Sequence, residues 1–451
     1  MNSGFFIMIQ MSMPSAIKKI CNKLRASGFE AYVVGGTIRD LIMNRQNSDF
    51  DIATSAFPNE IKSVFPNAKP YGNFGTMLVI ADGLKVEITP FRNDAPGRKP
   101  DYVFGGSIYT DLARRDFTIN SIAYDPIDDE LIDPFDGIKD IKNGVIKCTG
   151  STRRIWEDPL RAMRAARFQA QLGFSIDAST LYALKSHAKE LTGVSQERIR
   201  DELTKILTAD YNFDGLVTLV ITDLMNYIIP ELMAGMGVMH SNKPVDVLEH
   251  NLIACKVIRN TLPLRLAALL HDISKPETAV NCEEGLRFPK HQIESAAAAR
   301  EILQRLRFDN KTIKKVVLLI ENHMFFYTEN SSLADARRLI SKVGWENIYN
   351  LIDLRVADKI ASGFDRVYSP GLKKLIMDIE IIKNEQCGDY QIKDLAVTGE
   401  DIMSELGISP GPQVGKILNI LLDKVIENPS LNNKAALLEI AKTTLAAEQL
   451  T

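Results

Sequence analysis

Residues 33–54, VVGGTIRDLIMNRQNSDFDIAT, combine a short apolar strand, a glycine pair, a helix and an aspartate pair in that order. Gly35 and Gly36 end the strand and begin the helix, where backbone N–H groups and the helix N-terminus favour an anion. Arg39 lies one turn into that helix and is suited to a bidentate contact with a phosphate. A glycine pair alone is typical of a plain turn, so the aspartates decide the interpretation.

Asp49 and Asp51 are two residues apart in an extended segment and therefore point to the same side. Paired carboxylates, together with substrate phosphates, are a usual way to hold Mg²⁺. Two such ions suit in-line phosphoryl transfer, because one activates the attacking hydroxyl and the other neutralises the leaving pyrophosphate. Glu87 is the best candidate for a third catalytic carboxylate, because it faces away from Val86 and Ile88 on its own strand. An isolated Asp-x-Asp pair more often marks a solvated loop or cap, whereas the ordered combination is more specific.

The pattern on both sides of this stretch predicts a mixed α/β head. Apolar residues at helical spacing follow Ser15, which we expect to cap a helix that stops at Gly28. Alternating apolar positions predict adjacent strands at 77–80 and 84–88, and a further strand at 119–124.

Beyond Gly150 the strand signal fades, and amphipathic helical patterns continue to the C-terminus. The turn-rich residues 133–137 mark the end of the α/β part. We therefore predict a multidomain chain with an α/β (α+β) head, followed by an all-α neck, body and tail. The predicted segments are 15–145 for the head, 146–235 for the neck, 236–370 for the body and 371–451 for the tail.

The bulk composition is that of an ordinary globular protein. The 451 residues are 45% hydrophobic and carry a net charge of −3, so any nucleic acid must bind local basic patches. The five cysteines form no C-x-x-C pair, which indicates reduced thiols. The apolar run at 5–9 is short and lacks a basic segment before it, so we expect no signal peptide. No stretch approaches the roughly 20 apolar residues of a membrane span, and we predict a cytoplasmic protein with no membrane partner.

Three further motifs accompany residues 33–54: RRDFTIN at 114–120, DPFDG at 133–137 and EDPLR at 157–161. Together they closely resemble class II tRNA nucleotidyltransferases, which belong to the polymerase-β-like superfamily together with the bacterial poly(A) polymerases. The resemblance is dense over residues 30–205. It implies a polymerase-β-like head whose metal ligands are Asp49 and Asp51.

The same resemblance implies the contacts of the incoming nucleotide. Gly35, Gly36 and Arg39 hold the triphosphate, and Arg115 with Asp116 contacts the nucleotide. A surface charge cluster would be the ordinary interpretation of these last two residues without the neighbouring motifs.

Asp158 and Arg161 are three apart, so on a helix they share one face. Cytosine and adenine each present an amino donor beside a ring-nitrogen acceptor, whereas uracil and guanine present a carbonyl beside an N–H. A carboxylate next to a guanidinium therefore pairs with C or A and opposes U or G. The resemblance assigns this pair to base selection without a nucleic-acid template. The alternative is that Asp158 caps a helix that starts with Pro159.

Basic residues are concentrated in the same segment. Arg164 belongs to this local excess of arginines, which suits a triphosphate or an RNA 3′ end; a solvated basic helix face is the alternative. Residues 195–200, SQERIR, resemble the last motif of the family, and we expect a capped helix that braces the neck.

The body carries a second set of metal-binding residue types. His271 and Asp272 end the apolar helix LRLAALLHDISKP and, with flanking histidines and a later aspartate, resemble the HD phosphohydrolase pattern. Such ligands hold one or two divalent transition metals, such as Mn, Ni, Fe or Co, which generate hydroxide for phosphoester cleavage. Asp353 is a rival for the last ligand. The ligands implied are His250, His271, Asp272, His291, His323 and Asp358.

The tail from about residue 395 resembles the C-terminal region of the family, which holds the tRNA elbow. Gly415 and Lys416 lie near an expected helix start that suits a tRNA phosphate. A packing subdomain with incidental lysines is the alternative.

The leading prediction is therefore an enzyme that adds C and A from CTP and ATP to the tRNA 3′ end, using Mg²⁺. Its partners would be the tRNA 3′ end and acceptor stem, with no DNA. A specialist that adds only CC or only A is a close alternative, because the loop at 92–98 looks short for the family. A poly(A) polymerase, an HD phosphohydrolase with an RNA-binding head, and a non-enzymatic RNA-binding protein are the remaining alternatives.

Overall fold

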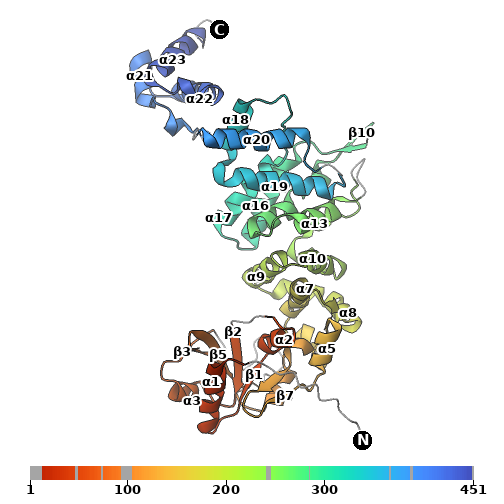
Figure 1. The fold of residues 1–451 in the computed structure, drawn as a ribbon. Coiled ribbons are helices and arrows are strands. Elements are labelled where there is room, and N and C mark those ends of the chain that lie inside the picture. Colours follow the sequence, from red (N-terminus) through yellow and green to blue (C-terminus); the bar gives the residue numbers. More distant parts are fainter. Residues whose placement is uncertain are drawn as a thin grey trace. The chain divides into compact units, whose positions relative to one another are not determined.

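The computed structural model describes residues 13–45, 49–72, 75–92, 104–239, 245–283, 285–364, 367–385 and 390–448 (Figure 1). The apolar run at 5–9 and residues 93–98 of the loop discussed above lie outside the described residues. The chain divides into two compact units, Met1–Pro230 and Glu231–Thr451.

A seven-stranded mixed sheet forms the centre of the head. Its order is β3-β4-β5-β2-β1-β6-β7, and β2 and β5 are parallel whereas all other neighbours are antiparallel. The strands are β1 (Ala31–Val34), β2 (Asp49–Thr54), β3 (Lys69–Pro70), β4 (Met77–Ala81), β5 (Leu84–Pro90), β6 (Ala123–Asp125) and β7 (Glu130–Ile132). The parallel pair occupies the interior, where Ile52 faces its register partner Ile88 and both are fully buried.

The strands predicted at 77–80 and 84–88 are confirmed as the antiparallel pair β4 and β5. The strand predicted at 119–124 is wrong in its first half, where Thr118–Asn120 form a 3-10 turn before β6. The turn forms because Asn120 and Ser121 hydrogen-bond back to residues 116 and 117 instead of pairing with a neighbouring strand.

Short helices cover the sheet. They are α1 (Ser15–Ala26), α2 (Gly36–Ile42), α3 (Pro58–Val64), α4 (Ile108–Ala113) and α5 (Gly137–Asn143). Helix α1 buries the apolar face that its spacing predicts and ends just before Gly28, whose φ is +90°. Ser15 does not cap it, because the N-cap position is occupied by Pro14.

The neck is helical except for the two-residue ladder of β8 (Val145–Ile146) with β9 (Ser175–Ile176), which the sequence did not predict. Its helices are α6 (Arg153–Glu157), α7 (Leu160–Leu172), α8 (Ala178–Ser186), α9 (Gln196–Leu207), α10 (Asn212–Ile221), α11 (Met225–Ile228) and α12 (Pro230–Met233). Helix α7 packs against α9 and α10. The contact with α10 is close, because a Cβ on Gly215 would lie 2.9 Å from the carbonyl oxygen of Ala166.

The second unit is mainly helical. Its body contains α13 (Val247–Val257), α14 (Leu262–Leu270), α15 (Lys275–Thr278), α16 (His291–Arg305), α17 (Asn310–Asn322), α18 (Leu333–Val343), α19 (Trp345–Ala361) and α20 (Pro370–Asn384). The all-helical prediction is wrong between α15 and α16, where β10 (Val280–Cys282) and β11 (Gly285–Arg287) form an antiparallel pair. These strands are short and largely exposed, so they lack the apolar alternation that predicts a strand.

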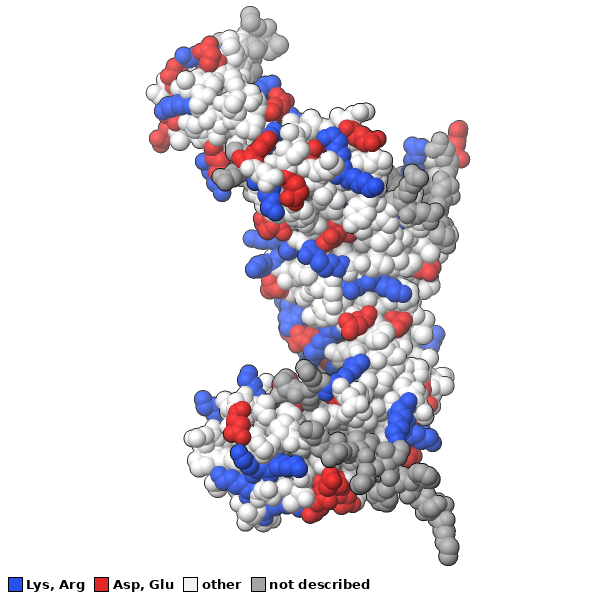
Figure 2. All heavy atoms as spheres, in the orientation of Figure 1, with Lys and Arg blue, Asp and Glu red and all other residues white. Residues whose placement is uncertain are grey.

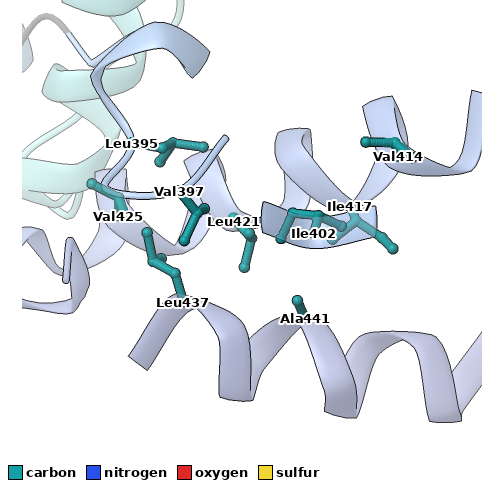
Figure 3. Packing of buried hydrophobic residues seen from close by; sticks show 9 residues of the cluster. All are labelled: Leu395, Val397, Ile402, Val414, Ile417, Leu421, Val425, Leu437 and Ala441. Atoms are coloured by element: carbon teal, nitrogen blue, oxygen red, sulfur yellow. The ribbon is translucent and has the colours of Figure 1, made fainter. Parts of the chain in front are cut away.

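The tail has an apolar core of its own, which Figure 3 shows in close view. It is built by α21 (Gly399–Leu406), α22 (Pro412–Glu427) and α23 (Lys434–Glu448). The buried residues of this core are Leu395, Val397, Ile402, Val414, Ile417, Leu421, Val425, Leu437 and Ala441. Burial of this set accounts for a compact C-terminal subdomain.

The surface carries both signs of charge. On the face drawn in Figure 2, Lys and Arg are interspersed with Asp and Glu, in line with the net charge of −3. The described cysteines, Cys21, Cys148, Cys255 and Cys282, are free thiols. Within the described residues, no helix has the combination of length and apolar character that crossing a bilayer requires.

Candidate active site

A cavity of about 600 Å³ lies in the first unit, between the β1–α2 turn, strand β2, helix α4 and the neck helices α7 and α9. Nine of the residues predicted to bind metal or nucleotide line it: Gly35, Gly36, Arg39, Asp51, Arg115, Asp116, Asp158, Arg161 and Arg164. Asp49 and Glu87 are not among the lining residues. The wall contains seven arginines and four aspartates, which leaves a net formal charge of +3. Such a surplus in a concave site attracts an anionic ligand.

Three carboxylates lie on the parallel strands β2 and β5, and one of them, Asp51, lines this cavity. Asp51 is the register partner of Glu87, so both side chains project from the same face of the sheet, and Asp49 precedes Asp51 by two residues on that face. Burial raises the pKa of Asp51. The positive charge of Arg115 lowers this pKa, whereas the negative charge of Asp49 raises it further. Burial also raises the pKa of Glu87, and the charges of Asp51 and Asp49 raise it further. Mutually repelling carboxylates of this kind favour a bound cation.

The glycine turn brings Arg115 beside these carboxylates. Gly35 has a φ of +72°, and a Cβ at this position would lie 2.7 Å from Nη1 of Arg115 and 3.6 Å from Oδ2 of Asp51. A residue with a side chain would therefore displace the guanidinium. Arg39 also lines the cavity, but its guanidinium is buried and donates to Asn120 at 2.7 Å and to Asp40 at 2.9 Å.

Asp111 is a site residue that the sequence analysis missed. It lies on α4, lines the cavity, and is only 1% exposed. Arg114 and Arg115 both donate to its carboxylate. The signal was present in the sequence, because residues three and four apart on a helix share one face.

Asp116 joins the head to the neck. Its Oδ2 accepts from Nε of Arg164 on α7 at 2.7 Å, and its Oδ1 accepts from Nδ2 of Asn120 at 3.0 Å. Burial alone would raise the pKa of Asp116, but Arg164 and Asn120 outweigh it and hold the pKa well below its usual range. Asp116 is therefore an anion beside the cavity at neutral pH.

Asp158 and Arg161 both line the cavity, but in this structure they do not pair side chain to side chain. Asp158 lies between α6 and α7 rather than on a helix, so the prediction that the two share a helix face is wrong. Its Oδ1 accepts from the N–H of Leu160 at 3.2 Å, a contact of the capping kind, and its Oδ2 lies 2.9 Å from Nη2 of Arg198. Arg198 also lines the cavity and is a second site residue that the sequence did not predict. Residues 195–200 were expected only to form a capped helix that braces the neck, and the Ser195 side chain does not cap that helix.

Other partners hold the Arg161 guanidinium. It donates to the backbone oxygens of Arg154 and Arg114 at 3.0 Å each, and its Nη1 also donates to Glu157 at 3.2 Å. Because Arg114 belongs to the head and Arg161 to the neck, the contact between them connects the end of the cavity predicted to hold the triphosphate with the end predicted to select the base.

The second unit contains two overlapping groups of metal-ligand side chains in its described part. One consists of His250, His271, Asp272 and Asp358, and the other of Asp272, His291 and His323. Each group offers atoms that all lie within 4.8 Å of one another. All six predicted residues are thus brought together. Asp353, the rival for the last ligand, instead lies 2.8 Å from Arg259 and is outside both groups.

Backbone contacts aim three of these histidines at the centre of the cluster. Nδ1 of His271, His291 and His323 each lies 2.7–2.8 Å from the carbonyl oxygen three residues earlier. An Nδ1–H that donates to a carbonyl leaves the Nε2 lone pair for a ligand, which is the usual arrangement of a metal-binding histidine. Oδ1 of Asp272 lies 3.2 Å from Nε2 of His291, yet neither atom has a hydrogen-bond partner among the residues that the structure describes. This donor set fits a transition-metal ion.

The fold and the cavity define a nucleotidyltransferase with a polymerase-β-like head. In line with this, the poly A polymerase head domain model matches residues 31–147, and the model of the probable RNA and SrmB-binding site of polymerase A matches residues 173–236. A model of tRNA nucleotidyltransferase domain 2 matches residues 290–441.

The chain belongs to the CCA-adding enzyme family of tRNA nucleotidyltransferases. It is 32% identical over 436 residues to the CCA-adding enzyme of Limosilactobacillus reuteri, with 94% of each chain covered. It is 31% identical over 437 residues to that of Lactococcus lactis, covering 95% of this chain and 97% of the relative. This confirms the family that the motifs indicated.

Solved structures agree with this assignment. The chain resembles the Bacillus stearothermophilus CCA-adding enzyme in complex with CTP, with a TM-score of 0.73 and 26% identity over 97% of this chain and 100% of the other. The Thermotoga maritima CCA-adding enzyme complexed with tRNA-CCA shares the fold, with a TM-score of 0.55 and 20% identity over 97% of each chain.

Proposed function

We propose that this protein adds C, C and A in order to the 3′ end of tRNA, using CTP and ATP and releasing pyrophosphate. The observation that carries the proposal is one cavity that is lined by Asp51 of β2 and a wall of arginines, with Glu87 of β5 as the register partner of Asp51. Relatives that are named CCA-adding enzymes, one of them solved with CTP and another with tRNA-CCA, support it.

Asp49, Asp51 and Glu87 would hold the divalent metal ion that this family uses, and we propose Mg²⁺ because the donors are carboxylate oxygens. The ion supplies activation of the attacking 3′-hydroxyl and neutralisation of the leaving pyrophosphate. Gly35 and Gly36 allow close approach of the triphosphate to the backbone, and Arg39 and Arg115 add positive charge.

Asp158 and Arg161 would read the base, with Arg164 and Asp116 beside them. Because the side chains of Arg198 and Glu157 contact Asp158 and Arg161, the base must exchange with those partners. Cytosine and adenine offer one donor and one acceptor on the edge concerned, so they satisfy both charges at once. We assign the RNA 3′ end and acceptor stem to the neck and tail, including Gly415 and Lys416, which are exposed in the first turns of α22.

The test uses tRNA transcripts that end before CCA, after C and after CC, each incubated with Mg²⁺ and labelled nucleotides singly and together. Addition of C, C and A with a clean stop supports the full activity. A halt after CC would identify a CC-adding specialist, and activity only on the CC-ended transcript an A-adding one. A long A tract would identify a poly(A) polymerase, and no addition to any transcript would contradict the proposal.

We propose a second function for the body, because six buried or nearly buried ligand side chains converge there. The site formed by His250, His271, Asp272, His291, His323 and Asp358 would bind a divalent transition metal for phosphoester hydrolysis. Metal content by mass spectrometry and hydrolysis of bis-p-nitrophenyl phosphate test it. His271→Ala should lose metal and hydrolysis while retaining nucleotide addition, and His187→Ala, outside the cluster, is the matched control. A metal-free native protein that does not take up Mn²⁺ would contradict this second proposal.

A further inference from the structure

One buried carboxylate in the cavity wall binds two neighbouring guanidinium groups. Oδ1 of Asp111 accepts from Nε and Nη2 of Arg114 at 2.9 and 2.7 Å. Oδ2 accepts from Nε and Nη2 of Arg115 at 3.3 and 3.1 Å. Each arginine therefore presents the same side-on edge to its own oxygen, which leaves Nη1 directed away from the carboxylate.

The shared carboxylate of Asp111 offsets the repulsion between the two guanidinium groups. Two guanidiniums that are adjacent in sequence and largely buried repel one another, and a shared anion between them offsets the repulsion. Burial alone would raise the pKa of Asp111, but Arg115 and Arg114 outweigh it and keep the carboxyl ionised. Asp111 thus remains the anion that the pair requires at neutral pH.

The position of the pair indicates what it binds. Asp111, Arg114 and Arg115 all line the cavity, and Nη1 of Arg115 is the atom nearest to the Cβ position of Gly35. That turn is where a triphosphate would approach the backbone, beside Asp51. The cavity wall has a formal surplus of +3, whereas a fully ionised nucleoside triphosphate carries a charge of about −4.

We propose that Asp111 is a positioning residue that holds Arg114 and Arg115 as a preformed pair for the triphosphate of the incoming nucleotide. This inference rests on the proposed nucleotide addition. Asp111 does not touch the nucleotide itself; it acts through the orientation of the two guanidiniums. The competing interpretation is a buried ion pair that only stabilises the short helix α4.

Asp111→Asn tests the proposal, because the amide keeps the shape but has one acceptor oxygen and directs an N–H₂ group at the second arginine. We expect the KM for both CTP and ATP to rise about tenfold or more, with kcat changed by less than about threefold. Inhibition by pyrophosphate, which probes the same phosphate groups without a base, should weaken by a similar factor.

Asp125→Asn is the matched control. Asp125 is equally buried at 3% exposed, forms an ion pair with Arg25 in the same head, and does not line the cavity. This variant should lower Tm while KM stays unchanged. If Asp111→Asn behaves in the same way, the residue is only structural and the proposal is overturned.

A double variant separates the two interpretations further. If Asp111 acts through the two arginines, then Asp111→Asn should add little to the KM of a variant that carries both Arg114→Met and Arg115→Met. Independent effects would multiply and contradict the proposal. Should Asp111→Asn fail to fold, Arg114→Lys and Arg115→Lys replace it, because a lysine cannot make the side-on pair. Unchanged KM in both lysine variants would also overturn the proposal. Lack of addition by the unmodified protein would instead refute the proposed function.

Discussion

Replacement of Gly35 by alanine tests how the turn before α2 serves nucleotide binding. Gly35 has φ 72° and ψ −139°, a conformation that is essentially restricted to glycine, so an alanine there costs about 1–3 kcal/mol of backbone strain. For a unit of this size, each kcal/mol corresponds to a fall in Tm of about 2–4 °C. The new Cβ would also lie 2.7 Å from Nη1 of Arg115, and the flexible guanidinium must move to relieve that contact. We therefore expect a modest loss of stability and a larger loss of nucleotide affinity.

The assay combines thermal unfolding with KM for CTP on a tRNA transcript that lacks CCA. Gly28→Ala is the control, because Gly28 also has a positive φ of +90° but no atom lies within 4 Å of its Cβ position. Both variants should unfold at lower temperature, but only Gly35→Ala should raise KM, by roughly tenfold, the effect of about 1.4 kcal/mol of lost phosphate contact. A folded Gly35→Ala variant with unchanged KM would refute the reasoning, since the displaced guanidinium would then have no role in binding.

Three further predictions concern the carboxylates of the same cavity. Asp51→Asn should abolish nucleotide addition without lowering Tm, because burial already raises the pKa of Asp51 and penalises its charge; melting curves beside a labelled-nucleotide assay check both points. The rate of nucleotide addition should fall as the pH drops through the raised pKa values of Asp51 and Glu87, because addition needs both carboxylates ionised. In pH–rate profiles, a higher Mg²⁺ concentration should move this acid limb to lower pH. Asp158→Ala should relax the choice of CTP and ATP over UTP and GTP by about tenfold in kcat/KM, whereas a large fall in Tm with unchanged selectivity would support the capping role instead.

Local patterns in the sequence were sufficient for several parts of the head. The glycine turn, the helix after it and the antiparallel pair β4–β5 follow from residue types that are a few positions apart. The aspartate pair on β2 was visible for the same reason, because the period of a strand places alternate residues on one side. The roles assigned to these residues are predictions that the variants above test.

Contacts between distant segments were not visible in this way. Nothing in the periodicity predicts that β2 and β5 are parallel neighbours, which is what sets Asp51 opposite Glu87. The contact of Arg198 with Asp158 likewise depends on how α9 packs against α7. Asp111 differs from these cases, since its spacing from the two arginines was readable in the sequence.

The partners of Asp158 and Arg161 give a physical account of how a protein could choose a base without a template. Protein groups already satisfy both charges, so a base that replaces these partners is bound favourably only if it satisfies both charges as well. A base with the reversed pattern places an acceptor against the carboxylate and a donor against the guanidinium. Each unsatisfied group then costs about 1–3 kcal/mol, which corresponds to a roughly 5- to 150-fold weaker affinity. The Asp158 side chain is 36% exposed, so water lowers its share of this penalty, and Arg161, at 19%, contributes more of it. On this reasoning, discrimination against U and G should depend more on Arg161 than on Asp158.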